Sequence, residues 1–254
     1  VLTGQGTPGN LAIWVTDSEL GDATVKVGVG DKSLIFNDLN GNLAGGDAAN
    51  AMGTGTSASG QYSTAMGNGT QAIGIGSTAI GTETTASGNY STAMGELTTA
   101  SGWYSTAMGQ NSVAKGDNSL AAGYNALADD GPMMVGSTIA LGTDVIADGH
   151  VSVAMGNQSK STGDASTAMG FSTLASGVMS TAMGRITTAN GDYSTSMGSQ
   201  TTASGVVSTA MGQSTEAGGE ASTAMGRFTT ASALSSTAMG EFTTASGDYS
   251  LATG

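Results

Sequence analysis

The sequence predicts an all-β protein, a parallel β-solenoid in which each 14-residue repeat forms one turn. The first observation is the repeat itself: residues 91–109 read STAMGELTTASGWYSTAMG, so the pentapeptide STAMG returns after 14 residues. The second is glycine, which accounts for 42 of the 254 residues and occurs twice in most repeats. Glycine and the abundant Thr both disfavour a helix. Two short strands and two tight bends therefore fit each repeat, with successive turns stacked about 4.8 Å apart.

The repeat is numbered here from its methionine column, position 0, which runs from Met52 to Thr253 and holds Met in most repeats. Position +1 is Gly in all fifteen repeats, from Gly53 to Gly254. Position +8 is Gly in nearly all of them, with Ala233 as an exception. Because Gly reaches backbone angles that strain other residues, we expect the bends at these two columns.

The positions that never carry charge predict which side chains point inward. Within the regular repeats, Asp, Glu, Lys and Arg occur only at positions +2, +3, +5, +7 and +9. Position −2 holds Thr, Val, Leu or Ile, position +4 mostly Thr or Ser, and position +6 mostly Ala. We therefore expect positions −2, 0, +4 and +6 to form the interior, with the period of two that strands impose. The predicted interior methionines are Met66, Met94, Met108, Met155, Met169, Met183 and Met211.

The opposite face of the same strand is also free of charge, with Ser at position −3 and Ala at position −1. An outward face in water usually gathers charge, so we expect this one to be buried against another chain. A lone solenoid of this composition buries little apolar area against roughly 1–2 kcal/mol of backbone entropy per residue. Association with closed symmetry makes up the deficit. The predicted interface residues are Ser91, Ser105, Ser180, Ala93, Ala107 and Ala182.

These motifs resemble the head repeat of the YadA-like trimeric autotransporter adhesins, which reads roughly S-V-A-I-G-x-x-S-x-A-x-G-x-x. SVAMG at 152–156 and the recurring STAMG carry the resemblance, which covers about residues 47–254. It implies a left-handed parallel β-roll, a homotrimer, and an extracellular position on a bacterial surface, anchored in the outer membrane through a region outside this sequence. It also implies a role in attachment and virulence. It implies no catalytic residues.

Residues 1–46 lie outside the repeats and predict a small N-terminal β cap that shields the edge of the first turn. Strands are expected at 11–15, 23–29 and 33–36, with Trp14 and Phe36 as core anchors. GQGTPGNLAIWVTDSELGDATVKVG resembles the capping segments of phage tail fibres and other trimeric fibres.

One insertion adds five residues to the repeat within residues 125–142, and we expect a loop near residues 129–136. Repeat proteins place insertions on one face, often a binding face. The loop is therefore either structurally tolerated or a protrusion that contacts a ligand. Met133 and Met134 are alternatively placed to fill a gap between chains.

Composition excludes several classes of function. A net charge of −13 with six bases does not suit nucleic acid, which requires Lys and Arg against its phosphates. The absence of Cys excludes disulfides and Cys-ligated zinc. The sequence has no run of 18 apolar residues, so it predicts no membrane-spanning helix. His150 is the only His, so neither a metal site nor a general base is expected there. We expect no enzyme activity and no cofactor, because catalytic solenoids need clustered acids and bases.

Two columns hold candidate ligand contacts. Tyr recurs at position +10 beside Trp103, and acids recur at position +9 every 28 residues in the last third of the chain. Exposed aromatics stack on sugars or grip proteins, but they also shield bends. The acids form either a stripe for a cationic partner or the trace of a duplicated two-turn unit. The candidates are Tyr62, Tyr90, Trp103, Tyr104, Asp164, Asp192 and Asp248.

The predicted function is adhesion to host matrix protein, glycan or another cell surface through many weak contacts repeated along the fibre. The alternative is a structural segment of a phage or injection-system tail fibre, at a virion or fibre tip, or of an extracellular filament. Ice binding is a third class, because outward Thr rows order water. The expected inward orientation of the Thr at positions −2 and +4 argues against it.

Overall fold

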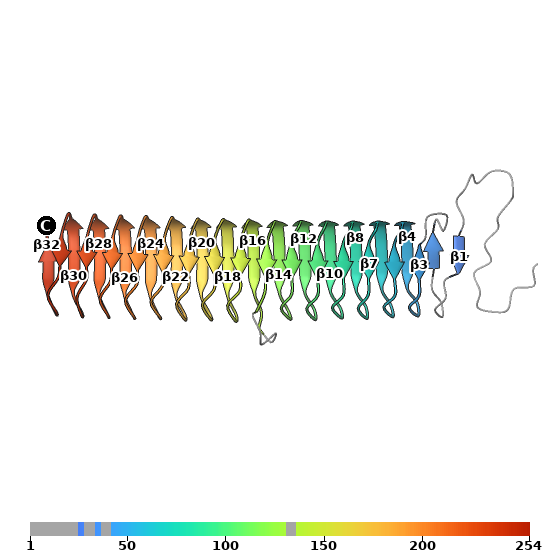
Figure 1. Ribbon diagram of the computed structural model, residues 1–254, viewed down its shortest axis with the longest axis horizontal. Helices are drawn as coiled ribbons and strands as arrows, with labels where there is room; N and C mark the ends of the chain where they lie inside the picture. Colours follow the sequence, from blue (N-terminus) through green and yellow to red (C-terminus); the bar gives the residue numbers. More distant parts are fainter. Residues whose placement is uncertain (1–24, 28–33, 37–41, 131–135) are drawn as a thin grey trace, which may run out of the picture.

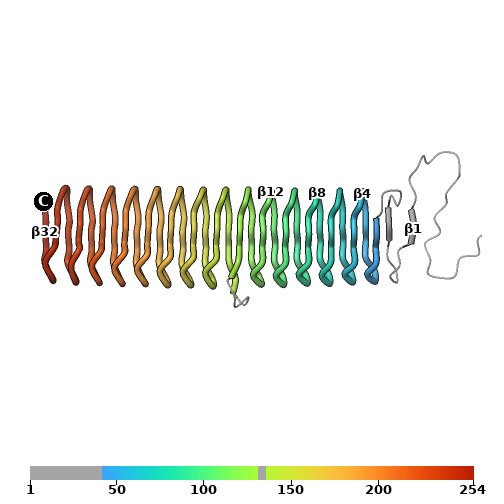
Figure 2. Tube along the Cα trace, in the orientation of Figure 1, coloured from blue at the N-terminus to red at the C-terminus, as the bar shows by residue number. Residues whose placement is uncertain are grey.

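The computed structural model describes residues 25–27, 34–36, 42–130 and 136–254. Every regular element in this part of the chain is a β-strand, and the strands stack into one long parallel solenoid (Figures 1 and 2). The predicted all-β solenoid of 14-residue turns is confirmed. Each turn contributes a five-residue strand at positions −2 to +2 and a two-residue strand at positions +5 and +6, as in β10 (Thr92–Glu96) and β11 (Thr99–Ala100).

The longer strands form a 17-stranded sheet, the first sheet, and the shorter strands form a 15-stranded sheet, the second sheet. The first sheet consists of β1 (Val25–Val27), β2 (Leu34–Phe36), β4 (Asn50–Thr54), β6 (Thr64–Asn68), β8 (Thr78–Thr82), β10, β12 (Thr106–Gln110), β14 (Leu120–Tyr124), β16 (Ile139–Thr143), β18 (Val153–Asn157), β20 (Thr167–Phe171), β22 (Thr181–Arg185), β24 (Thr195–Ser199), β26 (Thr209–Gln213), β28 (Thr223–Arg227), β30 (Thr237–Glu241) and β32 (Leu251–Thr253). The second consists of β3 (Leu43–Ala44), β5 (Ser57–Ala58), β7 (Gln71–Ala72), β9 (Thr85–Ala86), β11, β13 (Val113–Ala114), β15 (Leu127–Ala128), β17 (Ile146–Ala147), β19 (Lys160–Ser161), β21 (Leu174–Ala175), β23 (Thr188–Ala189), β25 (Thr202–Ala203), β27 (Glu216–Ala217), β29 (Thr230–Ala231) and β31 (Thr244–Ala245).

The register places each residue beside the residue of the same column in the next turn. Met94 pairs with Met108, and Gly95 pairs with Gly109. The insertion does not break this alignment, because Leu120 of β14 pairs with Ile139 of β16 across a repeat lengthened to 19 residues. Columns in the sequence are therefore straight rows along the solenoid.

At the N-terminal end, β1 pairs antiparallel with β2, and β2 pairs parallel with β4. These two strands lie within the segments predicted at 23–29 and 33–36 and sit beside the first turn. The strand expected at 11–15 and the anchor Trp14 fall outside the described residues, as does the side chain of Phe36. The boundary at residue 46 stays a prediction.

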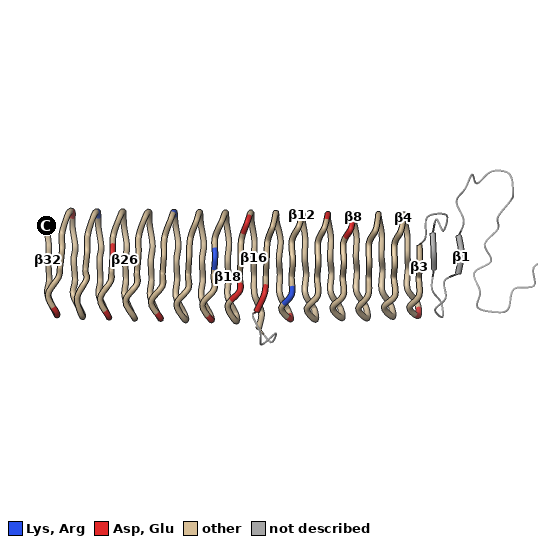
Figure 3. The backbone as a smooth tube through the Cα atoms, in the orientation of Figure 1, with Lys and Arg blue, Asp and Glu red and all other residues tan. Residues whose placement is uncertain are grey.

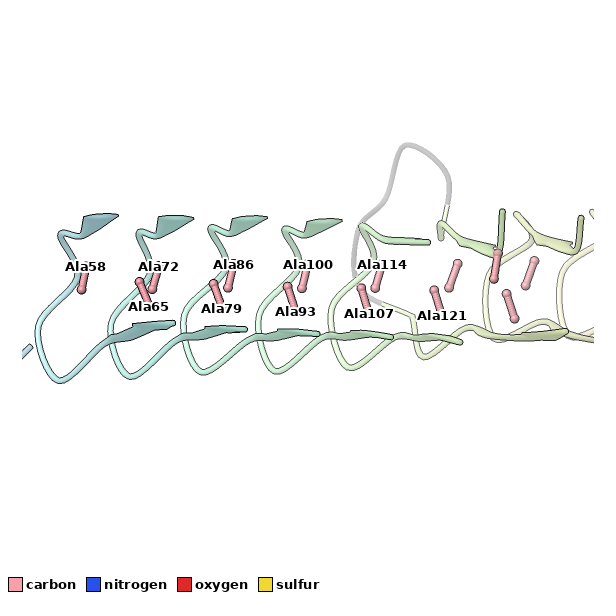
Figure 4. Packing of buried hydrophobic residues seen from close by; sticks show 14 of the residues in the cluster. Ala58, Ala65, Ala72, Ala79, Ala86, Ala93, Ala100, Ala107, Ala114 and Ala121 are labelled. Carbon is pink, nitrogen blue, oxygen red and sulfur yellow. The ribbon is translucent and has the colours of Figure 1, made fainter. Parts of the chain in front are cut away.

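Small side chains fill the interior. Ala at positions −1 and +6 is completely buried, as at Ala93 and Ala100, and Figure 4 shows the two rows of alanines pointing toward each other from the two sheets. Ser at position −3 and Thr or Ser at position +4 are buried with them, as at Ser91 and Thr98. Ser91 Oγ donates to the carbonyl of Gly88 at 2.7 Å, so the buried hydroxyl helps to close the bend.

This interior confirms the prediction for positions +4 and +6 and overturns it for positions −2 and 0. The first-sheet strand is reversed: Ser and Ala point inward, while Thr and Met lie half-buried on the outer face. The physical reason is space, because the largest fully buried side chain is Val145 and no methionine is among the buried residues. Met66, Met94, Met108, Met155, Met169, Met183 and Met211 are therefore outside the solenoid, and Ser91, Ser105, Ser180, Ala93, Ala107 and Ala182, expected between chains, are inside it.

The two glycine columns keep the turns close for different reasons. Gly95, at position +1, has φ +123° and its missing Cβ would lie 1.9 Å from the carbonyl oxygen of Gly109. Gly88, at position +8, has no left-handed φ, but a Cβ there would lie 2.0 Å from the carbonyl oxygen of Gly102. The bend expected at position +1 is absent, because Gly95 lies within strand β10 with a positive φ. The bend expected at position +8 is present, because Gly88 begins a turn, and a Cβ there would crowd the next turn of the solenoid.

Two adjacent glycines allow a direct test of this close stacking. A Cβ on Gly219 would lie 1.9 Å from the Ala233 carbonyl oxygen, whereas a Cβ on Gly218 would meet nothing nearer than 3.8 Å. We expect Gly219→Ala to lower the free energy of unfolding by roughly 1–3 kcal/mol through overpacking. Gly218→Ala should leave it unchanged. Thermal and urea melts followed by circular dichroism measure both, and equal stability of the two variants would contradict the close-stacking account.

Candidate functional site

The outer face of the first sheet repeats the same residue types along the solenoid. It consists of the residues at positions −2 and 0 of strands β4 to β30, and we call it the Thr/Met face. No Asp, Glu, Lys or Arg occurs at either position. The methionines are half-buried in the single chain. Seven of them pair in register without interruption, from Met155 to Met239.

Charged residues lie elsewhere. They occupy the ends of the first-sheet strands, the bends and the second sheet, where both signs are scattered along the solenoid (Figure 3). Lys115 Nζ lies 3.0 Å from Asp129 Oδ2, which pairs one of the few bases with an acid of the next turn. The Thr/Met face therefore contrasts with the rest of the surface, because it is long and free of charge at every turn.

Aromatic side chains meet at one bend of the first half. Tyr90 and Tyr104 stack with ring centroids 5.2 Å apart and planes at 9°, and Trp103 precedes Tyr104 in the chain. Each of the three is more than half exposed. We call Tyr90, Trp103 and Tyr104 the aromatic corner. Tyr62 lies at the same position two turns earlier, separated from Tyr90 by the turn that carries Gly76.

The backbone fixes the two tyrosines of this corner. Tyr90 and Tyr104 have left-handed φ values of 57° and 56°, which non-glycine residues adopt only when the surroundings impose them. Their N–H groups donate backward to carbonyls of the preceding turn, Tyr90 to Ile75 at 2.7 Å and Tyr104 to Asn89 at 2.9 Å. The backbone that carries the two stacked rings is consequently fixed by the solenoid itself.

The aspartates Asp164, Asp192 and Asp248 at position +9 have a structural partner that the sequence did not reveal. Asp192 Oδ1 accepts from the N–H of Val178 at 2.9 Å, and Asp164 and Asp248 accept in the same way from His150 and Leu234. Each Asp thus caps a donor of the turn before it, as Asp117 and Asn89 also do. The capped residues His150, Val178 and Leu234 lie in the turns that precede these acids, so the caps recur with the spacing of the acids. The three acids are exposed and two turns apart, so the structure does not bring them together.

Two substitutions of Asp192 distinguish the contribution of its hydrogen bond to stability from the contribution of its charge. We expect Asp192→Ala to lower the free energy of unfolding by about 0.5–1 kcal/mol, since one net hydrogen bond is lost. Asp192→Asn should be neutral, because the amide oxygen of Asn89 already performs the same task. Urea melts of the two variants measure this, and an equal loss in both would show that the negative charge, and not the bond, matters.

A second aromatic cluster was not predicted. Phe228 and Phe242 stack at 5.0 Å between centroids, with the Arg227 guanidinium 4.8 Å from the centre of the Phe228 ring and paired with Glu241. Its signal was the recurrence of RFTTAS and EFTTAS at the same columns of neighbouring turns.

At the insertion, Asp130 takes the place of the glycine at position +8. Its side chain is buried, and Oδ2 accepts from the N–H of Gly136 at 2.7 Å, so the carboxylate joins the two ends of the inserted segment. The predicted loop tip, with Met133 and Met134, lies outside the described residues. Whether it contacts a ligand stays a prediction.

Among residues 42–130 and 136–254, no helix is long and apolar enough to cross a bilayer.

A family model described as the YadA head domain repeat matches most of the solenoid. No curated protein matches the chain. The family model covers residues 44–70, 72–95, 100–126, 147–173, 175–201, 203–229 and 231–254, together more than half of the chain.

Proposed function

The chain belongs to the YadA head family, and on that premise we propose that it is the head of a trimeric adhesin, exposed on a bacterial surface, whose three protomers pack through their Thr/Met faces. The observation that carries this proposal is the face itself. It is uncharged over its whole length and ends in a row of half-buried methionines at every strand from β18 to β30. Three such faces turned toward a common axis cover the apolar surface that a single chain leaves in water.

Matched substitutions on two faces of the same turns test the packing. We expect Met169→Asp with Met197→Asp to keep the β-sheet circular dichroism spectrum but to give a molar mass near 24.6 kDa, because uncompensated buried charge opposes association. Ser176→Asp with Ser204→Asp adds the same charge to exposed positions of the same turns and should leave a trimer. Light scattering gives the mass. A trimer from the methionine variant would refute this interface.

A substitution inside the solenoid distinguishes a defect in folding from a defect in association. Ala182 is completely buried inside the chain, so Ala182→Asp should reduce the β-sheet signal itself. This is the opposite of the behaviour expected if Ala182 lay between chains.

The aromatic corner is the proposed ligand contact, with host matrix protein, glycan or another cell surface as the partner class. Tyr90, Trp103 and Tyr104 present exposed ring edges and a Tyr hydroxyl group from a preset backbone. A trimer repeats the corner three times, so avidity multiplies modest contacts. Tyr62 extends the proposed contact along the bend. The second carboxylate oxygens of Asp164, Asp192 and Asp248 are a further proposed contact for a cationic partner.

Binding by the aromatic corner is tested with the intact trimer. We expect Trp103→Ser with Tyr104→Ser to weaken binding to immobilised matrix proteins or arrayed glycans by at least about tenfold, as loss of an aromatic anchor does. Tyr193→Ser is the control, since Tyr193 stands at the same position without a neighbouring aromatic. If the double variant binds every tested surface like the parent, the corner is not the contact.

A structural fibre segment is the alternative, and the pairing of β2 with β4 favours it, because a segment outside the repeats that folds onto the first turn suits a fibre joint. The binding assay decides between the two, since a purely structural segment binds none of the surfaces.

Ice binding was set aside because the Thr at position −2 was expected to point inward, and that reason no longer holds. This Thr row faces outward. The column beside it on the same face is Met rather than Thr, which still distinguishes it from a T-x-T array. A monomeric mass for the unaltered chain would favour a lone solenoid with this face in water.

A further inference from the structure

The methionine column carries more sulfur than packing requires. Eleven of its fourteen positions from Met52 to Met239 are Met. The other three, Ile80, Ala122 and Leu141, pair in the same register with their neighbours. The geometry thus accepts aliphatic side chains in this column, and the repeated thioether adds a chemistry that Ile and Leu lack.

That chemistry is oxidation at sulfur. None of the eleven column methionines is buried in the single chain, so these residues are partly open to a small oxidant before association. In the trimer proposed above, the same sulfur atoms are covered by the other two protomers. Met179 provides a reference, because it lies at a bend and is 56% exposed, between Met169 and Met183 in the sequence.

We propose that the methionine column makes assembly sensitive to oxidation: a two-electron oxidant such as hydrogen peroxide modifies the unassembled chain and blocks trimer formation, whereas assembly protects the column. In the reaction, the O–O bond of peroxide breaks, one oxygen forms an S=O bond as sulfur loses two electrons, and the other oxygen leaves with both hydrogens as water. The product, methionine sulfoxide, is polar and is reduced back by methionine sulfoxide reductases. This inference rests on the proposed trimer.

The sulfoxide blocks packing because the Thr/Met face has few hydrogen-bond donors for the sulfoxide oxygen. Its only side-chain donors over most turns are the Thr hydroxyls at position −2. A sulfoxide oxygen must therefore be desolvated with at best partial compensation. The penalty recurs at each methionine of the in-register rows and in each of three chains.

The test compares chains oxidised before assembly. The full chain is unfolded in denaturant, treated with hydrogen peroxide, freed of oxidant with catalase and refolded by dilution, and its molar mass is measured by light scattering. Mass spectrometry of peptides confirms sulfoxide at the column. A matched variant carries Leu in place of all eleven column methionines, as Leu141 occurs naturally, and keeps Met133, Met134 and Met179. We expect the oxidised parent to form at least about tenfold less trimer than the untreated parent, and the oxidised variant to assemble normally.

A second experiment, reduction of the oxidised parent, tests the inference even if the Leu variant itself misfolds. Reduction of the oxidised parent by methionine sulfoxide reductases with a thiol is harmless to a chain without Cys and should restore the trimer. An oxidised parent that still assembles, or a reduced one that does not recover, overturns the inference while leaving the proposed trimer intact. An untreated parent that is monomeric overturns the proposed trimer instead.

Protection is measured on the assembled protein. With peroxide added to the native trimer, Met179 should be oxidised at least about tenfold faster than Met183. In the Met169→Asp, Met197→Asp variant, Met183 should lose this protection. Equal rates for Met179 and Met183 in the trimer would also overturn the inference.

Discussion

The close approach of successive turns at the two glycine columns is the constraint on which the rest of the structure depends. At Gly88 and Gly95 the neighbouring carbonyl occupies the place of a Cβ, so the backbone of one turn rests on that of the next. Each turn also has only a five-residue strand and a two-residue strand, so it encloses a narrow space, and Ala, Ser and Thr fill it. Larger apolar side chains then have no room inside. The methionines lie on the outer face for this reason, and the flat uncharged surface follows from the interior rather than from selection at that face alone.

An interior of this kind ties folding to association. Alanine methyl groups bury little apolar area each, whereas most of the described turns hold two non-glycine residues with left-handed φ, at positions +3 and +10, and each such residue carries strain. The inter-turn hydrogen bonds, the Asp caps at position +9 and the stacked rings of Tyr90 with Tyr104 offset part of this. In the proposed trimer, the covered methionine rows supply the apolar burial that the interior lacks.

Sequence reasoning reached the fold because the period was unambiguous, and it placed Thr98 and Ala100 correctly because positions +4 and +6, at and beside the short strand, carry no charge. It failed at Ala93 and Met94, since both faces of that strand lack charge and hydrophobic size was taken as the guide to the interior. The space that decides the question depends on the distance between two sheets, which no single column encodes. The caps made by Asp164, Asp192 and Asp248 were missed because their donors are backbone groups one turn away, and the recurrence of acids was consistent with either role.

The uniform register has an evolutionary consequence. Each turn contacts only the turn before and the turn after, and the columns of different turns are nearly interchangeable, so a gene that gains or loses one 42-nucleotide unit by recombination between its own repeats still encodes a complete solenoid. Each such event changes the reach of the fibre by about 4.8 Å and leaves all other neighbours unaltered. Length is therefore a trait that this architecture can vary without a compensating substitution anywhere else in the chain.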